Sequence, residues 1–354
     1  MVFDTAYDSM YLSAIFTVRR IATLALAGVG AVVFWVLSLP LPLLLGPMFA
    51  CLIAALIGVP MQGVKPVSDA MRPVLGVAVG ASLTPALFLR LDEMALSVAL
   101  IPPFILIIGL VGYPYFRRVW GYDPATSYYS AMPGGLQDMA IFGEAAGGDV
   151  RALSLIHTTR VLVIVSAMPF LISWLWGLSL TGPPGEPAST VPPMQYVVML
   201  VCAALGWWGG VRVGLFGAPI LGPLVVAGGA ALTGLLTVRP PAEAMLIAQF
   251  FLGLGIGVKY AGITMAEIRR CLSAALGYCV ILAVLSVIFA EIVIQTDLAP
   301  PLEAIMAFAP GGQAEMVLLA LIAGSDMAYV VTHHLVRIVV VIVGAPIVAR
   351  LMAK

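Results

Sequence analysis

Two stretches of the sequence decide the fold: SAMPGGLQDM at residues 130–139 and AFAPGGQAEM at residues 307–316. Each places Pro-Gly-Gly inside an apolar segment, and the two prolines are 177 residues apart. The same spacing recurs in scarce polar and charged residues. It pairs Gly134 with Gly311, Gly135 with Gly312, Asp138 with Glu315, Asp149 with Asp326, His157 with His334, Arg160 with Arg337 and Pro169 with Pro346. We infer that the chain is a duplication of one unit of about 175 residues.

The duplication also covers the earlier part of each half. LGVAVG (75–80) matches LGLGIG (252–257) at a spacing of 177, and LGPM (45–48) matches LGPL (221–224) at a spacing of 176. Small residues in such stripes let transmembrane helices approach closely. We therefore predict that the two glycine stripes are helix-packing surfaces.

The composition belongs to a membrane protein. Hydrophobic residues make up 62% of the 354 residues and charged residues only 10%, with a mean hydropathy of +1.10. A soluble domain has roughly 45–50% apolar and about 25% charged residues. The 17 basic and 17 acidic residues cancel, which gives no indication of nucleic-acid binding.

Each half contains six hydrophobic segments, separated by a Pro/Gly-rich linker at 181–193 that predicts no helix. The segments lie near 20–38, 41–59, 72–90, 94–116, 125–147 and 150–176, and near 196–211, 217–237, 243–262, 271–295, 300–324 and 327–351. The predicted organisation is an N-terminal segment (1–19), a first membrane repeat (20–176), the linker region (177–195) and a second membrane repeat (196–354).

The distribution of basic residues predicts the topology. Arg19 and Arg20 precede the first segment, and Arg350 and Lys354 follow the last, so both termini are expected in the cytoplasm. The linker carries Glu186 and no basic residue, so it is expected outside. An odd number of crossings per half is then required, although each half has six segments.

The fifth segment of each half resolves this conflict, because Pro-Gly-Gly interrupts it at its middle. About ten helical residues on either side of the break would span about 15 Å, half the hydrocarbon core. We therefore predict an all-α membrane protein with two inverted repeats, about ten transmembrane helices and two re-entrant hairpins, an architecture of many secondary transporters. The alternative is twelve crossings with parallel repeats.

The two Pro-Gly-Gly turns are the first candidates for a binding site. A helix that begins at each turn would offer unpaired N–H groups and the positive end of its dipole, which favours an anion. The alternative interpretation is a kink that only lets helices pack. The candidate substrate-binding residues here are Pro133, Gly134, Gly135, Gln137, Pro310, Gly311, Gly312 and Gln313.

Charged residues accompany both turns. Asp138 and Glu315 are candidates for binding a coupling ion, H⁺ or Na⁺, with compensation of the helix dipole as the alternative. Arg160 and Arg337 are expected near the bilayer centre, where each needs an anionic partner. That partner is either a substrate carboxylate or, structurally, Asp138 for Arg160 and Glu315 for Arg337.

Histidines and caps complete the pattern. His157 and His334 precede the arginines by three residues, which places them on the same helical faces, and both are candidate substrate ligands. His333 has no counterpart at the repeat spacing. Asp149 and Asp326 indicate helix N-caps.

The chain resembles the AbrB family of duplicated bacterial membrane proteins, which share Pro-Gly-Gly followed by an acidic residue and Met in both halves, as in PGGLQDM and PGGQAEM. The resemblance extends from about residue 20 to 352. It implies a bacterial inner-membrane protein and favours transport. Members are often labelled ammonia monooxygenases, but three histidines, two of them adjacent, do not suggest a metal centre.

We therefore predict a secondary transporter of a small organic anion, with a carboxylate as the favoured class. The two alternatives are a membrane-bound enzyme and a passive pore for a neutral solute. Transport would proceed by alternating access with H⁺ or Na⁺ coupling and without a cofactor. The expected partners are the anionic substrate and the lipid bilayer, with no nucleic acid. Two-fold symmetry is the commonest oligomeric arrangement, so a homodimer is the assembly that we expect.

Overall fold

The structure is a computed structural model, and it describes residues 17–83, 91–181, 185–215 and 217–352. The side chains of residues 91–93, 137 and 350–352 lie outside that description. So do Lys354, the side chain of Arg350 and most of the N-terminal segment, for which the sequence made predictions. Within the described ranges, all regular elements are helical and no strand is present.

Among the residues that the structure describes, seven helical stretches are long and apolar enough to cross a membrane. They are Val18–Val36, Met94–Val119, Val150–Trp176, Pro193–Arg212, Ala242–Tyr260, Met265–Gln295 and Met327–Ala349. Their outer faces carry large apolar side chains, such as Val29 (61% exposed), Trp174 (80%) and Val280 (64%). Exposing so many apolar helix faces to water would be unfavourable, so the chain is a multi-pass membrane protein.

Three of the ten predicted crossings are not among these seven stretches, because their helices are shorter or more polar. Helices α3 (Pro42–Leu56) and α12 (Ala218–Leu232) have 15 residues each, about 22 Å at the rise of an α-helix. The predicted start of the segment at 72–90 was wrong, because α4 (Lys65–Gly80) already begins at Lys65. Its first turns are polar: Asp69 accepts from Lys65 at 3.2 Å and lies 3.7 Å from Arg72. The number of crossings stays a prediction.

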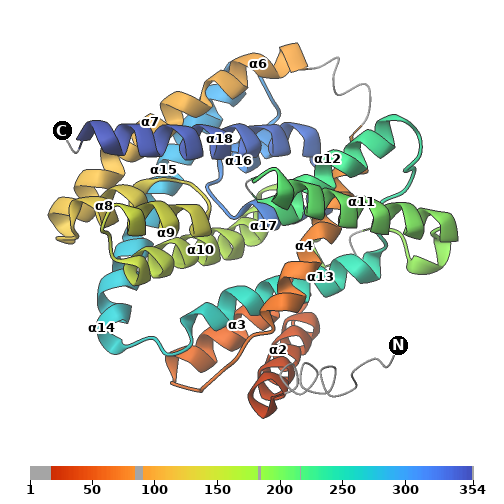
Figure 1. Cartoon of the computed structure of the whole chain (residues 1–354), viewed down its shortest axis with the longest axis horizontal. Coiled ribbons are helices and arrows are strands. Elements are labelled where there is room, and N and C mark those ends of the chain that lie inside the picture. Colours follow the sequence, from red (N-terminus) through yellow and green to blue (C-terminus); the bar gives the residue numbers. More distant parts are fainter. Residues whose placement is uncertain (1–16, 84–90, 182–184, 216, 353–354) are drawn as a thin grey trace. The chain divides into compact units, whose positions relative to one another are not determined.

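The chain folds into two compact units, and each takes helices from both halves of the duplicated sequence (Figure 1). Unit 1 holds the chain up to Ala78 together with Ser179–Ala227 and Val238–Ile263. Unit 2 holds Val79–Leu178, Gly228–Thr237 and the chain from Thr264 onward. The compact units therefore cut across the two sequence repeats.

Unit 1 contains two helix crossings that are copies of each other. In the first, α2 (Val18–Val36) crosses α3 at Gly30 and Gly46, and in the second, α11 (Pro193–Arg212) crosses α12 at Gly206 and Gly222. A Cβ atom on any of these glycines would overlap the backbone of the partner helix. Both pairs are related by the 176-residue spacing found in the sequence, so the duplication is present in the packing.

The third helices of the two halves exchange partners within unit 1. Gly253 of α13 (Ala242–Gly257) lies against the carbonyl group of Leu44 in α3. Correspondingly, Gly76 of α4 lies against the carbonyl group of Ile220 in α12. The prediction that both glycine stripes are packing surfaces is confirmed, because no side chain larger than hydrogen fits at either contact. Each half thus packs on the other in the same way, as a two-fold relation between them requires.

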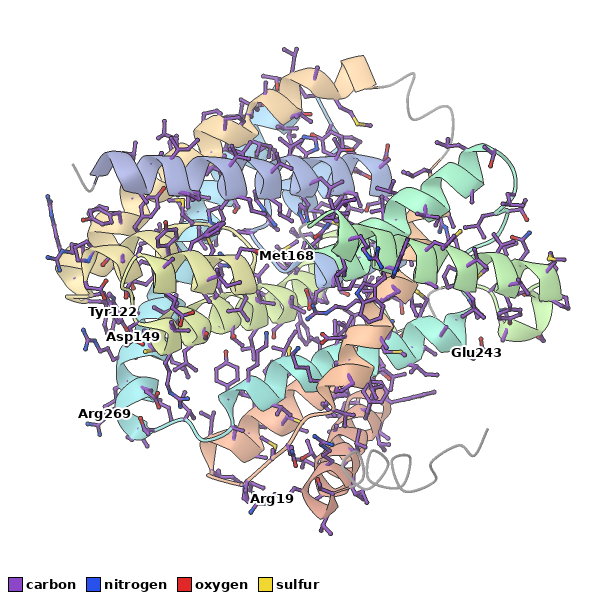
Figure 2. The ribbon with its side chains drawn as sticks, viewed as in Figure 1. Arg19, Tyr122, Asp149, Met168, Glu243 and Arg269 are labelled. Atoms are coloured by element: carbon purple, nitrogen blue, oxygen red, sulfur yellow. The ribbon has the colours of Figure 1, made fainter. Side chains whose placement is uncertain are left out.

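The linker packs on unit 1 without forming an α-helix. It contains a single 3-10 turn, Ala188–Thr190. The Glu186 carbonyl accepts from the backbone N–H of Ala242 at 2.8 Å, and the Glu243 carboxylate accepts from the N–H of Ala188 at 2.8 Å (Figure 2). The absence of an α-helix among its described residues agrees with the Pro/Gly-rich sequence.

Unit 2 is built from the later helices of each half. The first half supplies α6 (Leu91–Ala99), α7 (Ile101–Pro114), α8 (Pro124–Ala131), α9 (Leu136–Ala145) and α10 (Val150–Trp176). The second half supplies α14 (Met265–Glu267), α15 (Ser273–Gln295), α16 (Pro301–Phe308), α17 (Gln313–Ala323) and α18 (Met327–Met352). Two π-helical turns, Tyr115–Val119 and Ile268–Leu272, follow α7 and precede α15.

Both predicted broken segments are helical hairpins, α8–α9 and α16–α17. The two ends of each hairpin meet: Thr126 Oγ1 accepts from the N–H of Asp149 at 2.7 Å, and Glu303 Oε1 accepts from the N–H of Asp326 at 3.1 Å. These two bonds are again related by 177 residues. The chain therefore turns back at each Pro-Gly-Gly, after arms of 8 to 11 residues.

Candidate functional site

The two turns have the same backbone conformation. Gly135 precedes α9 with φ −67° and ψ 142°, and Gly312 precedes α17 with φ −70° and ψ 142°. A glycine in this N-cap position has no side chain that could accept a hydrogen bond from the first N–H groups of the helix. At both turns, no cap side chain accepts a hydrogen bond from these N–H groups. The start of each helix therefore keeps its positive end uncapped.

A methionine closes over each turn from the following helix. Met139 and Met316 are fully buried, and their side chains lie on Gly134 and Gly311. A Cβ atom on Gly134 would come within 2.8 Å of Met139 Cε, and one on Gly311 within 2.7 Å of Met316 Sδ. This contact explains why a methionine follows Pro-Gly-Gly at the same distance in both halves, a feature that sequence patterns alone do not explain.

Each predicted arginine holds the turn of its own half. Arg160 donates from Nη1 to the Met132 carbonyl at 3.1 Å and from Nη2 to the Gly134 carbonyl at 2.8 Å. Arg337 does the same at the second turn. The guanidinium fork suits two acceptors two residues apart.

At the second turn, Arg337 donates from Nη1 to the Ala309 carbonyl at 2.8 Å and from Nη2 to the Gly311 carbonyl at 3.2 Å. Arg160 and Arg337 are only 3% and 2% exposed. Within the described residues, the Nε of each is buried without a hydrogen-bond partner. Each guanidinium thus keeps one donor that the turn does not use.

The ion pairs considered as a structural alternative are not formed. No carboxylate of a described side chain lies within 4.0 Å of either guanidinium; salt bridges instead join residues elsewhere, such as Lys65 with Asp69 and Arg151 with Glu267. The sequence interpretation that paired Arg160 with Asp138 and Arg337 with Glu315 was therefore wrong. The physical reason is that turn carbonyls, which sequence patterns do not display, provide nearer acceptors.

The histidines repeat the same arrangement one turn earlier. His157 Nε2 bonds to the Tyr129 carbonyl at 3.0 Å, and His334 Nε2 bonds to the Met306 carbonyl at 3.0 Å. Both rings are fully buried, and their Nδ1 atoms have no partner among the described residues. His333 instead bonds to Tyr329 and Ser97, which agrees with its lack of a counterpart.

The two carboxylates lie in the first turns of the helices that follow. Glu315 folds back over Gly312, the residue before α17. Asp138 Oδ2 is buried without a partner within the described part of the chain. Gln313 Nε2 is similarly buried without a partner there, whereas the side chain of Gln137 lies outside the described residues.

The predicted N-caps of the long helices are confirmed. Asp149 accepts from the N–H groups of Arg151 and Ala152 at 3.0 Å. Asp326 accepts from those of Ala328 at 3.1 Å and Tyr329 at 3.2 Å. Both aspartates start the helices that carry the arginines, so they fix the register of His157 and Arg160 and of their counterparts.

Helix α15 contributes two residues that the sequence did not indicate. The Tyr278 hydroxyl donates to the Ala131 carbonyl at 2.6 Å, and the Ser286 hydroxyl donates to the Phe308 carbonyl at 3.0 Å. These carbonyls are equivalent in the two hairpins, yet both donors come from one helix. The repeat could not reveal them, because Tyr278 and Ser286 correspond to Ile101 and Gly109.

The two turns come together in unit 2 through α10. Val161 and Ile164, which follow Arg160 on α10, lie where Cβ atoms on Gly312 and Gly311 would approach within 3.2 Å. The arrangement thus concentrates positive charge, from two guanidinium groups and two uncapped helix starts, around the paired turns.

Among the described residues, no three His, Cys, Asp or Glu side chains form a group that could hold a metal ion. The side chains at the turns are instead suited to hydrogen bonding and charge neutralisation. Their donors include the arginine Nε atoms and the Gln313 amide, and their acceptors are the two carboxylates.

Comparisons with known proteins support one assignment. The family described as "Transition state regulatory protein AbrB" matches residues 43–353. The chain is 27% identical to "Uncharacterized protein YhjN" of Bacillus subtilis (strain 168), over 79% of this chain and 77% of that protein. It is 23% identical to "Putative regulator AbrB" of Escherichia coli (strain K12), over 90% of this chain and 92% of that protein. Because the family match covers most of the sequence, including both Pro-Gly-Gly turns, the chain belongs to the AbrB family.

Proposed function

We propose that the chain is a secondary transporter that moves a small organic anion, of the carboxylate class, across the bacterial inner membrane. The observation that carries the proposal is the pair of buried arginines at the two turns. Arg160 and Arg337 have no carboxylate partner among the described residues, and each retains an unused buried donor.

A buried charge without a counter-charge is costly, so it favours binding of an opposite charge. A carboxylate between the turns could accept from Arg160 Nε, from Arg337 Nε and from the first N–H groups of α9 and α17. Turn glycines allow the ligand to approach the backbone closely. The remaining predicted ligands, Gln313, Gln137 and the two histidines, would then select the rest of the substrate.

Coupling to an ion would use Asp138 or Glu315. Both carboxylates lie in the first turn of a hairpin helix without a basic partner in the described chain. Binding of H⁺ or Na⁺ would neutralise the carboxylate and reduce its repulsion toward an anionic substrate. Substrate and coupling ion would therefore bind together, which is the requirement for symport.

The architecture that supports alternating access is the predicted one, with ten crossings, two re-entrant hairpins and both termini in the cytoplasm. Its support is the reciprocal packing of the halves in unit 1 and the repeated hairpins of unit 2. Inverted repeats with discontinuous helices place the substrate near the middle of the bilayer. A homodimer would be the simplest assembly.

A thermal-stability screen of the purified protein in detergent tests the proposal. The panel contains small carboxylates, sulfonates, ammonium, divalent metals and neutral solutes, each with and without Na⁺ and at two pH values. A ligand that binds only the folded state stabilises it by about 2.7 kcal/mol at one hundred times its Kd. We expect a rise in Tm with one class of carboxylates, larger in Na⁺ or at the lower pH.

Arg337→Gln should abolish the carboxylate-induced shift, whereas Arg19→Gln, at an exposed arginine, should preserve it. The Tm of each variant without ligand shows whether it is folded. If the carboxylates produce no shift and ammonium does, a pore for a neutral solute replaces the transporter. If only a metal shifts the Tm, and metal copurifies in stoichiometric amount, a membrane-bound enzyme becomes the better assignment.

A further inference from the structure

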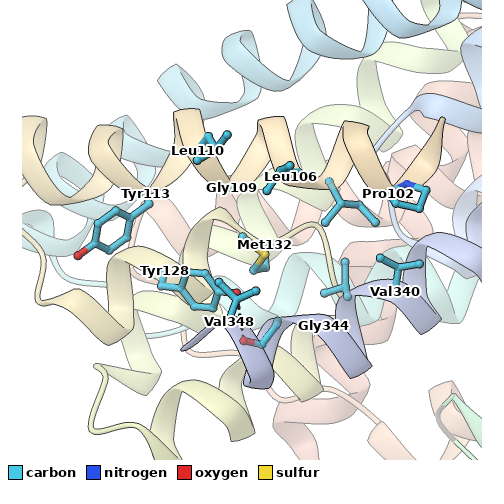
Figure 3. A pocket seen from close by; sticks show the side chains of 13 residues that line it. Pro102, Leu106, Gly109, Leu110, Tyr113, Tyr128, Met132, Val340, Gly344 and Val348 are labelled. Atoms are coloured by element: carbon cyan, nitrogen blue, oxygen red, sulfur yellow. Dashed lines mark hydrogen bonds between the residues drawn. The ribbon is translucent and has the colours of Figure 1, made fainter. Parts of the chain in front are cut away.

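A groove outside the paired turns runs along unit 2 between α7 and α18 (Figure 3). Its volume is about 280 Å³, and its walls are almost entirely apolar. Figure 3 shows Pro102 and Val340 at one end and Tyr113 with Val348 toward the other. The two helices therefore run in the same direction along the groove, with their C-terminal parts at the Tyr113 end.

The outer edge of the groove is open to the hydrocarbon phase. Leu106 is 61% exposed, Leu110 is 65% exposed and Val348 is 42% exposed. All three line the groove, and all lie on helices of a multi-pass membrane protein. Lipid acyl chains are the apolar molecules that surround such a surface.

The floor of the groove belongs to the first hairpin. Met132, whose carbonyl accepts from Arg160, contributes its side chain to the lining. Tyr128 lies beside it, and its hydroxyl donates to the Ala345 carbonyl of α18 at 3.0 Å. An occupant of the groove would thus touch the residue that immediately precedes Pro133.

Basic residues lie just beyond the Tyr113 end. Helix α7 continues into the π-helical turn that carries Arg117 and Arg118, both exposed. Arg117 also donates to the Tyr122 carbonyl at 2.7 Å, and the Arg270 guanidinium lies 4.6 Å from the centre of the Tyr122 ring.

Acidic residues also lie at this end of unit 2, among them Glu144, which is exposed near the end of α9. Asp123 and Asp149 accept from the N–H groups that begin α8 and α10, and Glu267 pairs with Arg151. Figure 2 shows Tyr122, Asp149 and Arg269 at this end. Arg117 and Arg118 are exposed beyond the end of the groove and carry the positive charge that suits a phosphate headgroup.

We infer that this groove is a binding site for an anionic phospholipid, with one acyl chain between α7 and α18 and the phosphate at Arg117 and Arg118. One phospholipid molecule accounts for both parts of the site, the apolar groove and the basic end. Because Met132 forms its floor, the bound chain would support the first turn from the membrane side. The site is independent of the proposed substrate.

The test is native mass spectrometry of delipidated protein titrated with dioleoylphosphatidylglycerol or dioleoylphosphatidylethanolamine. Each basic residue near the headgroup is expected to contribute about a fivefold gain in affinity. The wild-type protein should therefore bind the anionic lipid roughly 25-fold more tightly than the zwitterionic one. Arg117→Gln combined with Arg118→Gln should remove this preference, and Arg19→Gln should preserve it.

Gly344→Leu tests the groove itself. Gly344 lines the groove, and a Cβ atom there would meet nothing within 4 Å, so the added side chain starts in open space and is expected to occupy the groove. Gly28→Leu is the matched control, because Gly28 of α2 also has open space around its Cβ position. Gly344→Leu should weaken binding of both lipids at least tenfold, and Gly28→Leu should not.

Val348→Phe, at an exposed position of the same groove, provides a second filling variant if Gly344→Leu is poorly folded. Its expected effect is the same loss of both lipids. Equal binding of the two lipids by the wild-type protein would overturn the assignment of the headgroup. Unchanged binding by folded filling variants would overturn the assignment of the acyl chain.

Discussion

At the scale of single residues, the arginines combine two tasks. Arg160 and Arg337 each donate from both Nη atoms to carbonyls of a turn, and each keeps a buried Nε without a partner in the described chain. The first task holds the turn in shape. The second leaves positive charge beside the helix start, which is what an anionic substrate requires.

Arg337→Lys separates these tasks. Lysine keeps the charge, but its single ammonium group cannot reproduce the parallel donors of the guanidinium. One charged hydrogen bond to the Ala309 or Gly311 carbonyl would be lost, which is worth about 1.5–3 kcal/mol. We expect a lower Tm of the purified protein and loss of most of the carboxylate-induced shift.

Arg19→Lys is the control for this substitution, because the Arg19 side chain is exposed. An unchanged Tm for Arg337→Lys would mean that the turn does not depend on the fork. If the carboxylate-induced shift also persisted, the unused donor at Nε would have no part in binding. The two readouts therefore judge the structural and the functional task separately.

At the scale of elements, glycines set the distances between helices. The helices of unit 1 approach so closely that backbone atoms of one helix occupy the space of a side chain on the other. Membrane helices gain little from burying apolar surface against each other, so this close packing provides their association energy. The position of a glycine along the stripe decides whether it faces the neighbouring helix, and only a glycine that faces it is needed for this close packing.

Gly253→Ala and Gly255→Ala form a matched pair on α13. A Cβ atom on Gly253 would overlap the Leu44 carbonyl, which is backbone and cannot move aside, whereas the nearest atom to one on Gly255 is Ser68 Oγ at 3.6 Å. We expect Gly253→Ala to destabilise the protein by about 1–3 kcal/mol. Gly255→Ala should be neutral, or stabilising by about 0.5–1 kcal/mol through helix propensity.

Thermal unfolding of both variants in the same detergent measures the difference, and size-exclusion chromatography confirms that each is monodisperse. A Tm of Gly253→Ala equal to that of Gly255→Ala would contradict the packing of α13 on α3. The comparison needs no knowledge of the substrate. It tests the fold alone.

The sequence predicted these elements where its signal was strong. Pro-Gly-Gly cannot continue a helix, so it located both turns, and Asp before an apolar run located the N-caps. The start of α4 was missed, because Lys65, Asp69 and Arg72 are helical yet not hydrophobic. The arginine partners and the Tyr278 and Ser286 contacts were missed for another reason. They involve backbone carbonyls brought together only by tertiary packing.

At the scale of the whole molecule, the duplication is used twice. Each unit is compact by itself and assembled from both halves, so contacts between helices of the two halves contribute to the packing of each unit. The alternating access that we propose would involve a rigid-body movement of part of the molecule. The paired turns both belong to unit 2, so they would stay together in a movement that keeps this unit intact.

The orientation of the halves in the membrane is open to direct measurement. All four cysteines, Cys51, Cys202, Cys271 and Cys279, are buried, so the wild-type protein should react poorly with a maleimide that cannot cross membranes. Ser189→Cys places an exposed thiol in the linker, and Arg269→Cys places one at an exposed position before α15. The wild-type protein gives the background of the labelling.

In spheroplasts, the inverted arrangement predicts that Ser189→Cys reacts without permeabilisation, because an odd number of crossings puts the linker outside. Arg269→Cys should react only after permeabilisation, because basic loops stay in the cytoplasm. If both thiols required permeabilisation, the linker would be cytoplasmic and each half would cross the membrane an even number of times. Both hairpins would then span the membrane as ordinary pairs of helices, the repeats would be parallel, and the two turns would lose their place at the middle of the bilayer.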